Sequence, residues 1–156
     1  MILKSFQIEK INLDLNQFIL FYGKNEGLKI EAIKNLIKNK NEISSYDEKE
    51  ILDNSNTFIE NIFSKSLFEK EKIIIIKRAT DKILKILDEL NNRNIEDVKI
   101  IIKSDNLEKR SKLRSFFEKD KKYICIAFYP DNEQTLSKLA YNFLKEKNIA
   151  MSPVNI

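Results

Sequence analysis

The residues that could do chemistry lie between two glycines near the N-terminus. Residues 23–29 read GKNEGLK and follow a compact apolar run, so they occupy the turn at which a strand–helix unit holds phosphate. A P-loop needs four residues between its glycines and then Lys-Ser or Lys-Thr. Here three residues separate Gly23 from Gly27, and the hydroxyl that would hold Mg²⁺ is missing. Gly23, Lys24 and Gly27 therefore indicate a degenerate loop that binds no nucleotide.

The charges around this loop have the wrong sign for ATP chemistry. Glu26 places a carboxylate where phosphate would sit. An ATPase also needs acidic residues after a buried strand to position metal and water, but the run of isoleucines at 73–76 is followed by Lys77 and Arg78. The chain has 0 His and 1 Cys, which argues against a metal site and against histidine-based catalysis. We therefore expect no catalytic residues, no metal, no cofactor and no enzymatic activity.

A basic segment is the second candidate site. Residues 103–122 hold eight basic and four acidic side chains, so this segment accounts for the whole net charge of +4. Such a segment is most simply one solvated face of a helix. The alternative is a surface that follows the phosphates of a nucleic acid, as in a nucleic-acid-binding module acting through the 109–122 face. On that hypothesis the DNA-contacting residues are Lys109, Arg110, Lys112 and Arg114.

A pair of large apolar residues, Leu67 and Phe68, is the third candidate. The pair stands between a predicted helix over 53–66 and the isoleucine strand, with four charged residues after it. Leu67 continues the inward stripe of the helix, which favours a place in the core. Phe68 breaks that stripe, which favours exposure and contact with a partner. The pattern alone leaves both interpretations open.

Length and composition indicate one globular domain over residues 1–150 and a short tail over 151–156. The 156 residues are enough for a real core, and 42% hydrophobic with 33% charged residues excludes a disordered chain. The N-terminus has no signal-peptide shape, and no apolar run approaches membrane length. We expect a reduced, cytoplasmic protein with no membrane partner.

Strand and helix patterns alternate along the chain. Short apolar runs predict buried strands at 18–23, 73–76, 98–102 and 123–129, with a short peripheral strand at 43–46. Apolar residues at helical spacing predict helices at 26–40, 53–66, 81–90, 107–119 and 131–147. Residues 2–15 alternate weakly and fit either an edge strand or an irregular arm. The fold class is therefore α/β, with a five-stranded, mainly parallel sheet and helices on both faces.

Four stretches carry a family resemblance: the apolar run 18–23 with its degenerate loop, SLF at 66–68 before the isoleucine strand, NLEKRSKLR at 106–114, and FYPDNE at 128–133. Together they resemble the N-terminal domain of the delta subunit of the bacterial DNA polymerase III clamp loader. Their order and spacing carry the resemblance, which spans nearly the whole chain and about the first half of a family member. The family's lid and collar domains lie outside it.

The resemblance implies an AAA+ core with no ATPase of its own. It implies a clamp-loader subunit that binds the sliding clamp (the beta subunit) and helps to open it during DNA replication, with other loader subunits and, indirectly, primed DNA as further partners. By position, Leu67 and Phe68 match the apolar pair that enters a pocket on the clamp. Ser66 and Phe63 would orient that pair. The family's clamp-binding residues thus correspond to Phe63, Ser66, Leu67 and Phe68.

Overall fold

The computed structural model describes residues 1–38, 42–64, 72–93, 95 and 97–149. A six-stranded sheet lies at its centre in the order β1-β6-β2-β5-β4-β3, and every described strand pairing is parallel. The strands are β1 (Ile2–Lys4), β2 (Phe18–Tyr22), β3 (Ile43–Asp47), β4 (Lys72–Lys77), β5 (Val98–Lys103) and β6 (Ile124–Ala127). The helical elements are η1 (Ser5–Lys10), α1 (Glu26–Leu36), α2 (Glu48–Asp53), α3 (Ser55–Phe63), η2 (Asp81–Ile83), α4 (Leu84–Asn92), α5 (Lys112–Lys119) and α6 (Glu133–Glu146).

The α/β class with helices on both faces is confirmed, but the predicted number of five strands is wrong. The sixth strand is β1, which pairs with β6 through Ile2 and Cys125 at the edge of the sheet. Three residues are too few to show an alternating pattern, and Ile2 is exposed. The parallel pairing that orders this segment comes from β6, more than 120 residues away in the sequence.

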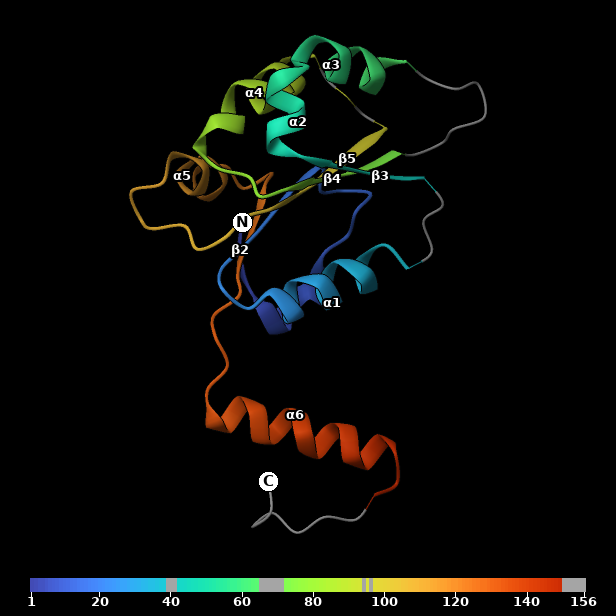
Figure 1. Ribbon diagram of the computed structural model, residues 1–156, viewed down its shortest axis with the longest axis vertical. Coiled ribbons are helices and arrows are strands. Elements are labelled where there is room, and N and C mark those ends of the chain that lie inside the picture. Colours follow the sequence, from blue (N-terminus) through green and yellow to red (C-terminus); the bar gives the residue numbers. More distant parts are fainter. Residues whose placement is uncertain (39–41, 65–71, 94, 96, 150–156) are drawn as a thin grey trace.

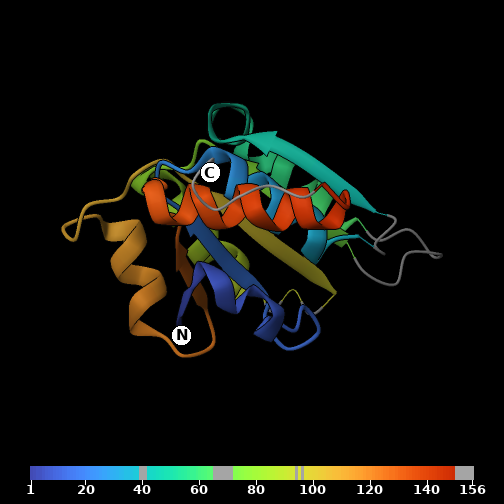
Figure 2. The same ribbon diagram turned by 90° about the horizontal axis from the view of Figure 1, so that it is seen from below.

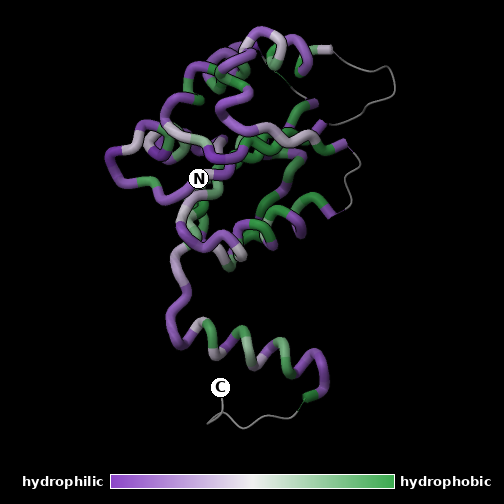
Figure 3. The backbone as a smooth tube through the Cα atoms, viewed as in Figure 1, coloured by the Kyte–Doolittle hydropathy of each residue, from purple (hydrophilic) through white to green (hydrophobic). Residues whose placement is uncertain are grey.

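The sheet buries both of its faces, which explains its unbroken apolar runs. Along β4, Ile74 and Ile76 point to the layer that contains α2, α3, α4 and α5. Ile73 and Ile75 point to the opposite layer, built by η1 and α1. Figure 1 shows these two layers above and below the sheet, and Figure 3 shows the hydrophobic strands enclosed between them.

All five predicted helices differ from the observed ones at their ends. The helix expected over 26–40 is α1, which ends at Leu36, and the helix expected over 131–147 is α6, Glu133–Glu146. The helix expected over 53–66 is α3, which runs from Ser55 to Phe63, and Asn54 separates it from α2 (Glu48–Asp53), a short helix that was not predicted. The helix expected over 81–90 begins with the 3₁₀ turn η2. The basic helix expected over 107–119 begins at Lys112, where the Ser111 side chain accepts from the Arg114 amide. Capping at Ser111 fixes the start of the helix because it satisfies an otherwise unpaired amide of the first turn.

Helix α6 is confirmed, yet its apolar face is not buried. Asn132 caps it and exchanges hydrogen bonds with Thr135. No residue of α6 is buried, and the helix stands away from the body beyond the layer of η1 and α1 (Figure 1). Within the described part of the chain, no helix is long and apolar enough to cross a membrane.

Candidate functional site

Gly23 sits at the end of β2 because no other residue fits there. Its φ is +122°, and a Cβ at this position would lie 2.1 Å from the carbonyl oxygen of Phe128. The Gly23 amide donates to the Asp105 carbonyl oxygen (3.1 Å). The first glycine of the loop therefore holds the ends of β2, β5 and β6 close together.

The second glycine has no comparable constraint. A Cβ on Gly27 would meet only the side-chain oxygen of Asn25, at 3.8 Å. Asn25 caps α1 by accepting from the Leu28 amide, and its side-chain nitrogen donates to Asp131 (2.7 Å). Lys24 is exposed. The turn is thus closed by its own side chains, rather than being built as an open cradle of amides.

A carboxylate and two ammonium groups form ion pairs at the N-terminus of α1, the end of a helix that attracts anions. Glu26, the first residue of α1, forms an ion pair with Lys29 (2.9 Å) and another with Lys103. Lys29 is 1% exposed and also donates to the Ser104 carbonyl oxygen (2.8 Å). The hydrogen bond from Lys103, reinforced by that from Lys29, lowers the pKa of Glu26 below its usual value. Both lysines therefore share the single Glu26 carboxylate in ion pairs within the chain.

The edge of the sheet after β4 is also occupied by internal pairs. Arg78, whose backbone is left-handed with a φ of 54°, forms an ion pair with Asp47 at the end of β3. The nearby Glu48 carboxylate accepts from the Thr80 amide (2.7 Å) and from its hydroxyl (2.9 Å). In the described residues, no group of three or more His, Cys, Asp and Glu side chains could hold a metal ion.

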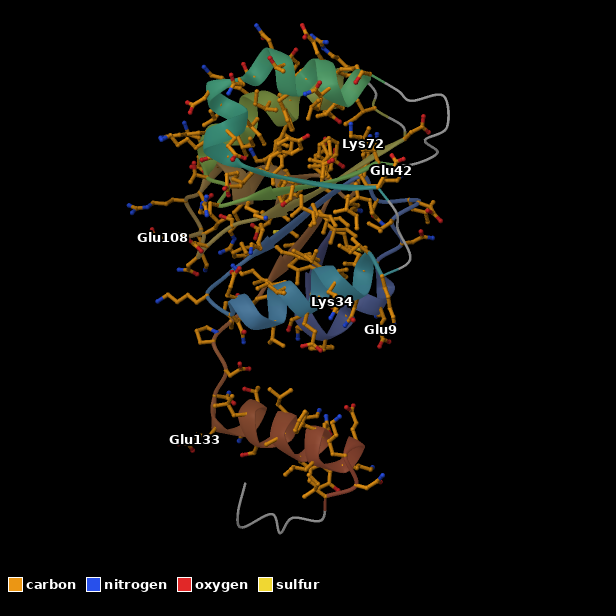
Figure 4. The ribbon with its side chains drawn as sticks, turned by 45° about the vertical axis from the view of Figure 1, so that its right-hand side comes forward. Glu9, Lys34, Glu42, Lys72, Glu108 and Glu133 are labelled. Carbon is orange, nitrogen blue, oxygen red and sulfur yellow. The ribbon has the colours of Figure 1, made fainter. Side chains whose placement is uncertain are left out.

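One part of the basic segment faces solvent, and another part makes contacts within the fold. Lys109, Arg110 and Lys112 are all exposed, on the turn before α5 and on its first residue. Arg110 forms an ion pair with Glu108 (2.8 Å), and both side chains remain largely exposed. Figure 4 shows Glu108 on this outer turn. Three of the four predicted DNA-contacting residues therefore share one solvent-facing surface, which we call the basic turn.

Arg114, the fourth residue of that prediction, has a different environment. Its side chain is 19% exposed and its Nε donates to Glu118 (2.7 Å). Its guanidinium lies over the Tyr22 ring, 5.3 Å from the centroid. The Glu118 carboxylate raises the pKa of Arg114 above its already high value. This arrangement fastens α5 to the end of β2 and leaves Arg114 apart from the basic turn.

The apolar pair of the clamp-contact prediction lies outside the described residues. Ser66, Leu67 and Phe68 belong to the range 65–71, whose structure is not described. Phe63, the last residue of α3, is 37% exposed. The Arg93 guanidinium lies 5.2 Å from the centroid of the Phe63 ring, which holds this side of α3 against the end of α4.

This arrangement of strands matches a solved structure, the DNA clamp loader delta protein (YqeN) of Bacillus subtilis. The likeness has a TM-score of 0.67 at 14% sequence identity and covers 96% of this chain. The chain spans about half of that protein, 49% of its length. No family model matches the sequence, and no curated protein matches it. The resemblance predicted from the sequence is thus confirmed at the level of the fold.

Asp81 is a residue of this clamp-loader-like fold that the sequence does not single out. Its carboxylate accepts from the Ser111 hydroxyl (2.7 Å), the Leu113 amide (2.9 Å) and the Lys112 amide (3.1 Å). The hydrogen bond from the Leu113 amide is the main reason that the pKa of Asp81 is lowered. Asp81 thereby fixes the start of α5 and the base of the basic turn. No local motif signals this, because the partners are 30 residues away.

Proposed function

We propose that this chain is a non-catalytic, AAA+-type clamp-loader domain that binds the sliding clamp and helps to hold one clamp interface open during DNA replication. The fold shared with a clamp loader delta protein over 96% of the chain carries the proposal. Working with other loader subunits, on primed DNA in the cytoplasm, is part of the same proposal. The loop in which Glu26 occupies the phosphate position agrees with a subunit that has no ATPase of its own.

In this proposal the clamp contact is made by Leu67 and Phe68, with Ser66 and Phe63 orienting them. The pair follows α3 and precedes β4 in the sequence, so it belongs to the connection that leads into an internal strand of the sheet. An aromatic and an aliphatic side chain next to each other are the kind of small anchor that dominates a protein interface. Phe63, fixed by Arg93 at the end of α3, would set the direction in which that connection leaves the domain.

The test is direct binding of the chain to the sliding clamp of the same organism. The clamp is immobilised, the chain is passed over it, and an unrelated ring-shaped protein serves as the control surface. We expect saturable binding that changes little between low and moderate salt, because the contact is mainly apolar. Absence of binding at concentrations at which the chain remains folded by circular dichroism would refute the proposal.

A second candidate function is nucleic-acid binding through the basic turn. The observation in its favour is the set of three exposed cations, Lys109, Arg110 and Lys112, within a segment that holds the whole net charge. Affinity from phosphate contacts falls steeply with salt. Salt dependence therefore distinguishes this function from clamp binding, and one protein could have both.

A further inference from the structure

The ends of α3 and α4 meet in a contact between an aromatic ring and an arginine. The Arg93 guanidinium lies 5.2 Å from the centroid of the Phe63 ring, which is a cation–π distance. Glu89, one turn earlier on α4, forms an ion pair with the same guanidinium (2.6 Å). All three side chains remain open to solvent, with Phe63 37%, Arg93 52% and Glu89 40% exposed. We call these three residues the Phe63–Arg93 surface.

The Phe63–Arg93 surface has the composition of a protein contact. Aromatic residues and arginine are enriched in protein interfaces and among the few residues that carry most of the binding energy. A guanidinium is planar and weakly hydrated, so a partner can cover its flat face at little cost. Because Arg93 is already paired with Glu89, it does not need an acidic residue on the partner. Such a surface suits a flat and largely apolar patch on another protein.

The position of this surface links it to Leu67 and Phe68, the apolar pair of the proposed clamp contact. Phe63 is the last residue of α3. The ammonium group of Lys72, at the start of β4 (Figure 4), donates to the Asn61 carbonyl oxygen in the last turn of α3 (3.0 Å). Four residues of extended chain reach at most about 14 Å. A partner that holds the apolar pair therefore comes within that distance of Phe63 and of Lys72.

An ordinary protein contact is large enough to include the Phe63–Arg93 surface. A stable interface covers about 800 Å² on each partner, which is a round patch with a radius of about 16 Å. A patch of that size centred on the apolar pair extends to the end of α3 and to the Arg93 side chain that stacks on it. Two side chains supply only part of such an area, and the ends of α3 and α4 supply surface beside them.

The Phe63–Arg93 surface lies away from α6. Helices α3 and α4 cover the face of the sheet opposite to α1, and α6 stands beyond α1 (Figure 1). In Figure 2, which views the molecule from the side of α6, α6 lies in front of the sheet and α3 and α4 lie behind it. Chain that follows α6 therefore starts on the opposite side of the molecule from Phe63 and Arg93.

We propose that Arg93 and Phe63 form a second part of the sliding-clamp contact, beside the apolar pair. This inference rests on the proposed clamp-binding function. Arg93 contributes the flat face of its guanidinium, which is stacked on Phe63 and paired with Glu89 before the clamp arrives. A side chain that is already held in place loses less freedom on binding than a mobile one. Because the ion pair stays within the chain, this part of the contact adds little salt dependence.

Clamp binding by three variants of the full chain tests this contact. Arg93→Ala removes the guanidinium, and Arg93→Lys keeps the charge but removes the planar group. Lys85→Ala removes an exposed cation elsewhere on α4 and is the control. We expect the affinity to be about tenfold weaker for Arg93→Ala, several-fold weaker for Arg93→Lys and unchanged for Lys85→Ala. The Tm should change little in all three, because the replaced side chains are exposed.

A photocrosslinker distinguishes direct contact with the clamp from an indirect effect through α3. Asn92→Cys, next to Arg93 and exposed, is labelled with benzophenone maleimide. Lys24→Cys, exposed at the opposite edge of the sheet, is the control. Cys125 stays in place because it is buried, and burial raises the pKa of its thiol to about 12. We expect a crosslink to the clamp from Asn92→Cys and a several-fold lower yield from Lys24→Cys.

The outcomes distinguish a wrong contact from a wrong function. If the unmodified chain does not bind the clamp, the proposed function is refuted and the Arg93 contact with it. If the unmodified chain binds and Arg93→Ala binds equally well, only the Arg93 contact is refuted. Weaker binding by Arg93→Ala with no crosslink from Asn92→Cys would overturn it too, and would leave Arg93 as a residue that only fixes α3. Full affinity of Arg93→Lys would show that the planar guanidinium is not recognised.

Discussion

The Glu26 carboxylate lies 2.9 Å from the ammonium group of Lys29, in the first turn of α1. In a phosphate-binding loop this helix N-terminus would attract the anion of a nucleotide. Here the anion is the Glu26 carboxylate of the chain itself. Its partner Lys29 is buried, with only 1% of the residue exposed. The loop is therefore a closed structural element, and a ligand would have to displace an internal ion pair.

The first prediction is that the protein neither binds nor hydrolyses ATP. Lys29 remains bonded to the Ser104 carbonyl oxygen, and the loop has no hydroxyl for Mg²⁺. Titration calorimetry with Mg-ATP should give no heat of binding, and Glu26→Gln should not restore it. Micromolar binding by the unmodified chain would contradict this interpretation of the loop.

The second prediction concerns acid stability. Because the pKa of Glu26 is lowered in the folded state, its contribution is present above the ordinary carboxyl value of 4.5 and is lost as the pH falls through the folded value. Glu26 is 49% exposed, so Glu26→Gln should cost only about 1 kcal/mol at pH 7. The difference in Tm between the two proteins should shrink as the pH falls below 4.5.

Glu31→Gln is the matched control for that experiment. Glu31 lies on the same helix and is exposed. Its replacement should leave the Tm nearly unchanged at every pH. A Tm difference for Glu26→Gln that stays constant down to strongly acidic pH would show that the ion pair is not the cause.

The third prediction is that Asp81 holds the start of α5. Asp81→Ala removes an acceptor shared by Ser111, Lys112 and Leu113, and it should lower the free energy of unfolding by about 1 kcal/mol, as for the loss of a helix cap. Asp88→Ala, an exposed carboxylate on α4, is the control and should cost little. Chemical denaturation measures both. Equal effects of the two substitutions would show that the Asp81 hydrogen bonds contribute nothing.

The fourth prediction is that any DNA binding depends on the basic turn. Reversing the charges of Lys109, Arg110 and Lys112 to Glu should remove the binding. Each phosphate contact that is lost should reduce the slope of log affinity against log salt by about one. Arg114 stays unchanged in this variant, because its contacts with Glu118 and Tyr22 belong to the fold.

The matched control reverses three exposed lysines elsewhere, Lys24, Lys34 and Lys38. This change alters the net charge by the same amount on the side of α1. Equal loss of DNA binding in both variants would indicate a general charge effect. Unaltered binding by the basic-turn variant would rule out the basic turn as the DNA site.

The strands buried on both faces could be predicted from the sequence, because each is a short, nearly unbroken apolar run. Phe18–Tyr22 lies at the centre of the parallel sheet and Ile73–Ile76 lies next to the edge strand β3, and both runs are buried on both faces. The boundaries of the turn after β2 could be predicted too, since β2 ends at Tyr22 and α1 begins at Glu26. The local sequence pattern was therefore sufficient to predict elements whose formation depends on neighbouring residues or on burial alone.

The rest depends on interactions between distant residues. β1 forms because β6 offers it a partner, and the capping of α5 by Asp81 joins segments 30 residues apart. The apolar stripe of α6 predicted a packed helix, but periodicity shows only that a face could be buried and not what covers it. Arg114 was grouped with its basic neighbours in sequence, whereas its tertiary contacts separate it from them.

The last prediction is that Leu67 and Phe68 bind the clamp. Burying two such side chains in a pocket should contribute about 3–6 kcal/mol, part of which is offset by ordering their connection. Leu67→Ala with Phe68→Ala should therefore abolish clamp binding, while Tm barely changes, because residues that face solvent contribute little to the fold. The control is Leu15→Ala, which removes an 80% exposed leucine and should affect neither quantity. If Leu67 and Phe68 were core residues, the double substitution would instead lower the free energy of unfolding by several kcal/mol. A large drop in Tm for the double variant would assign the pair to the core and remove it from the clamp-binding site.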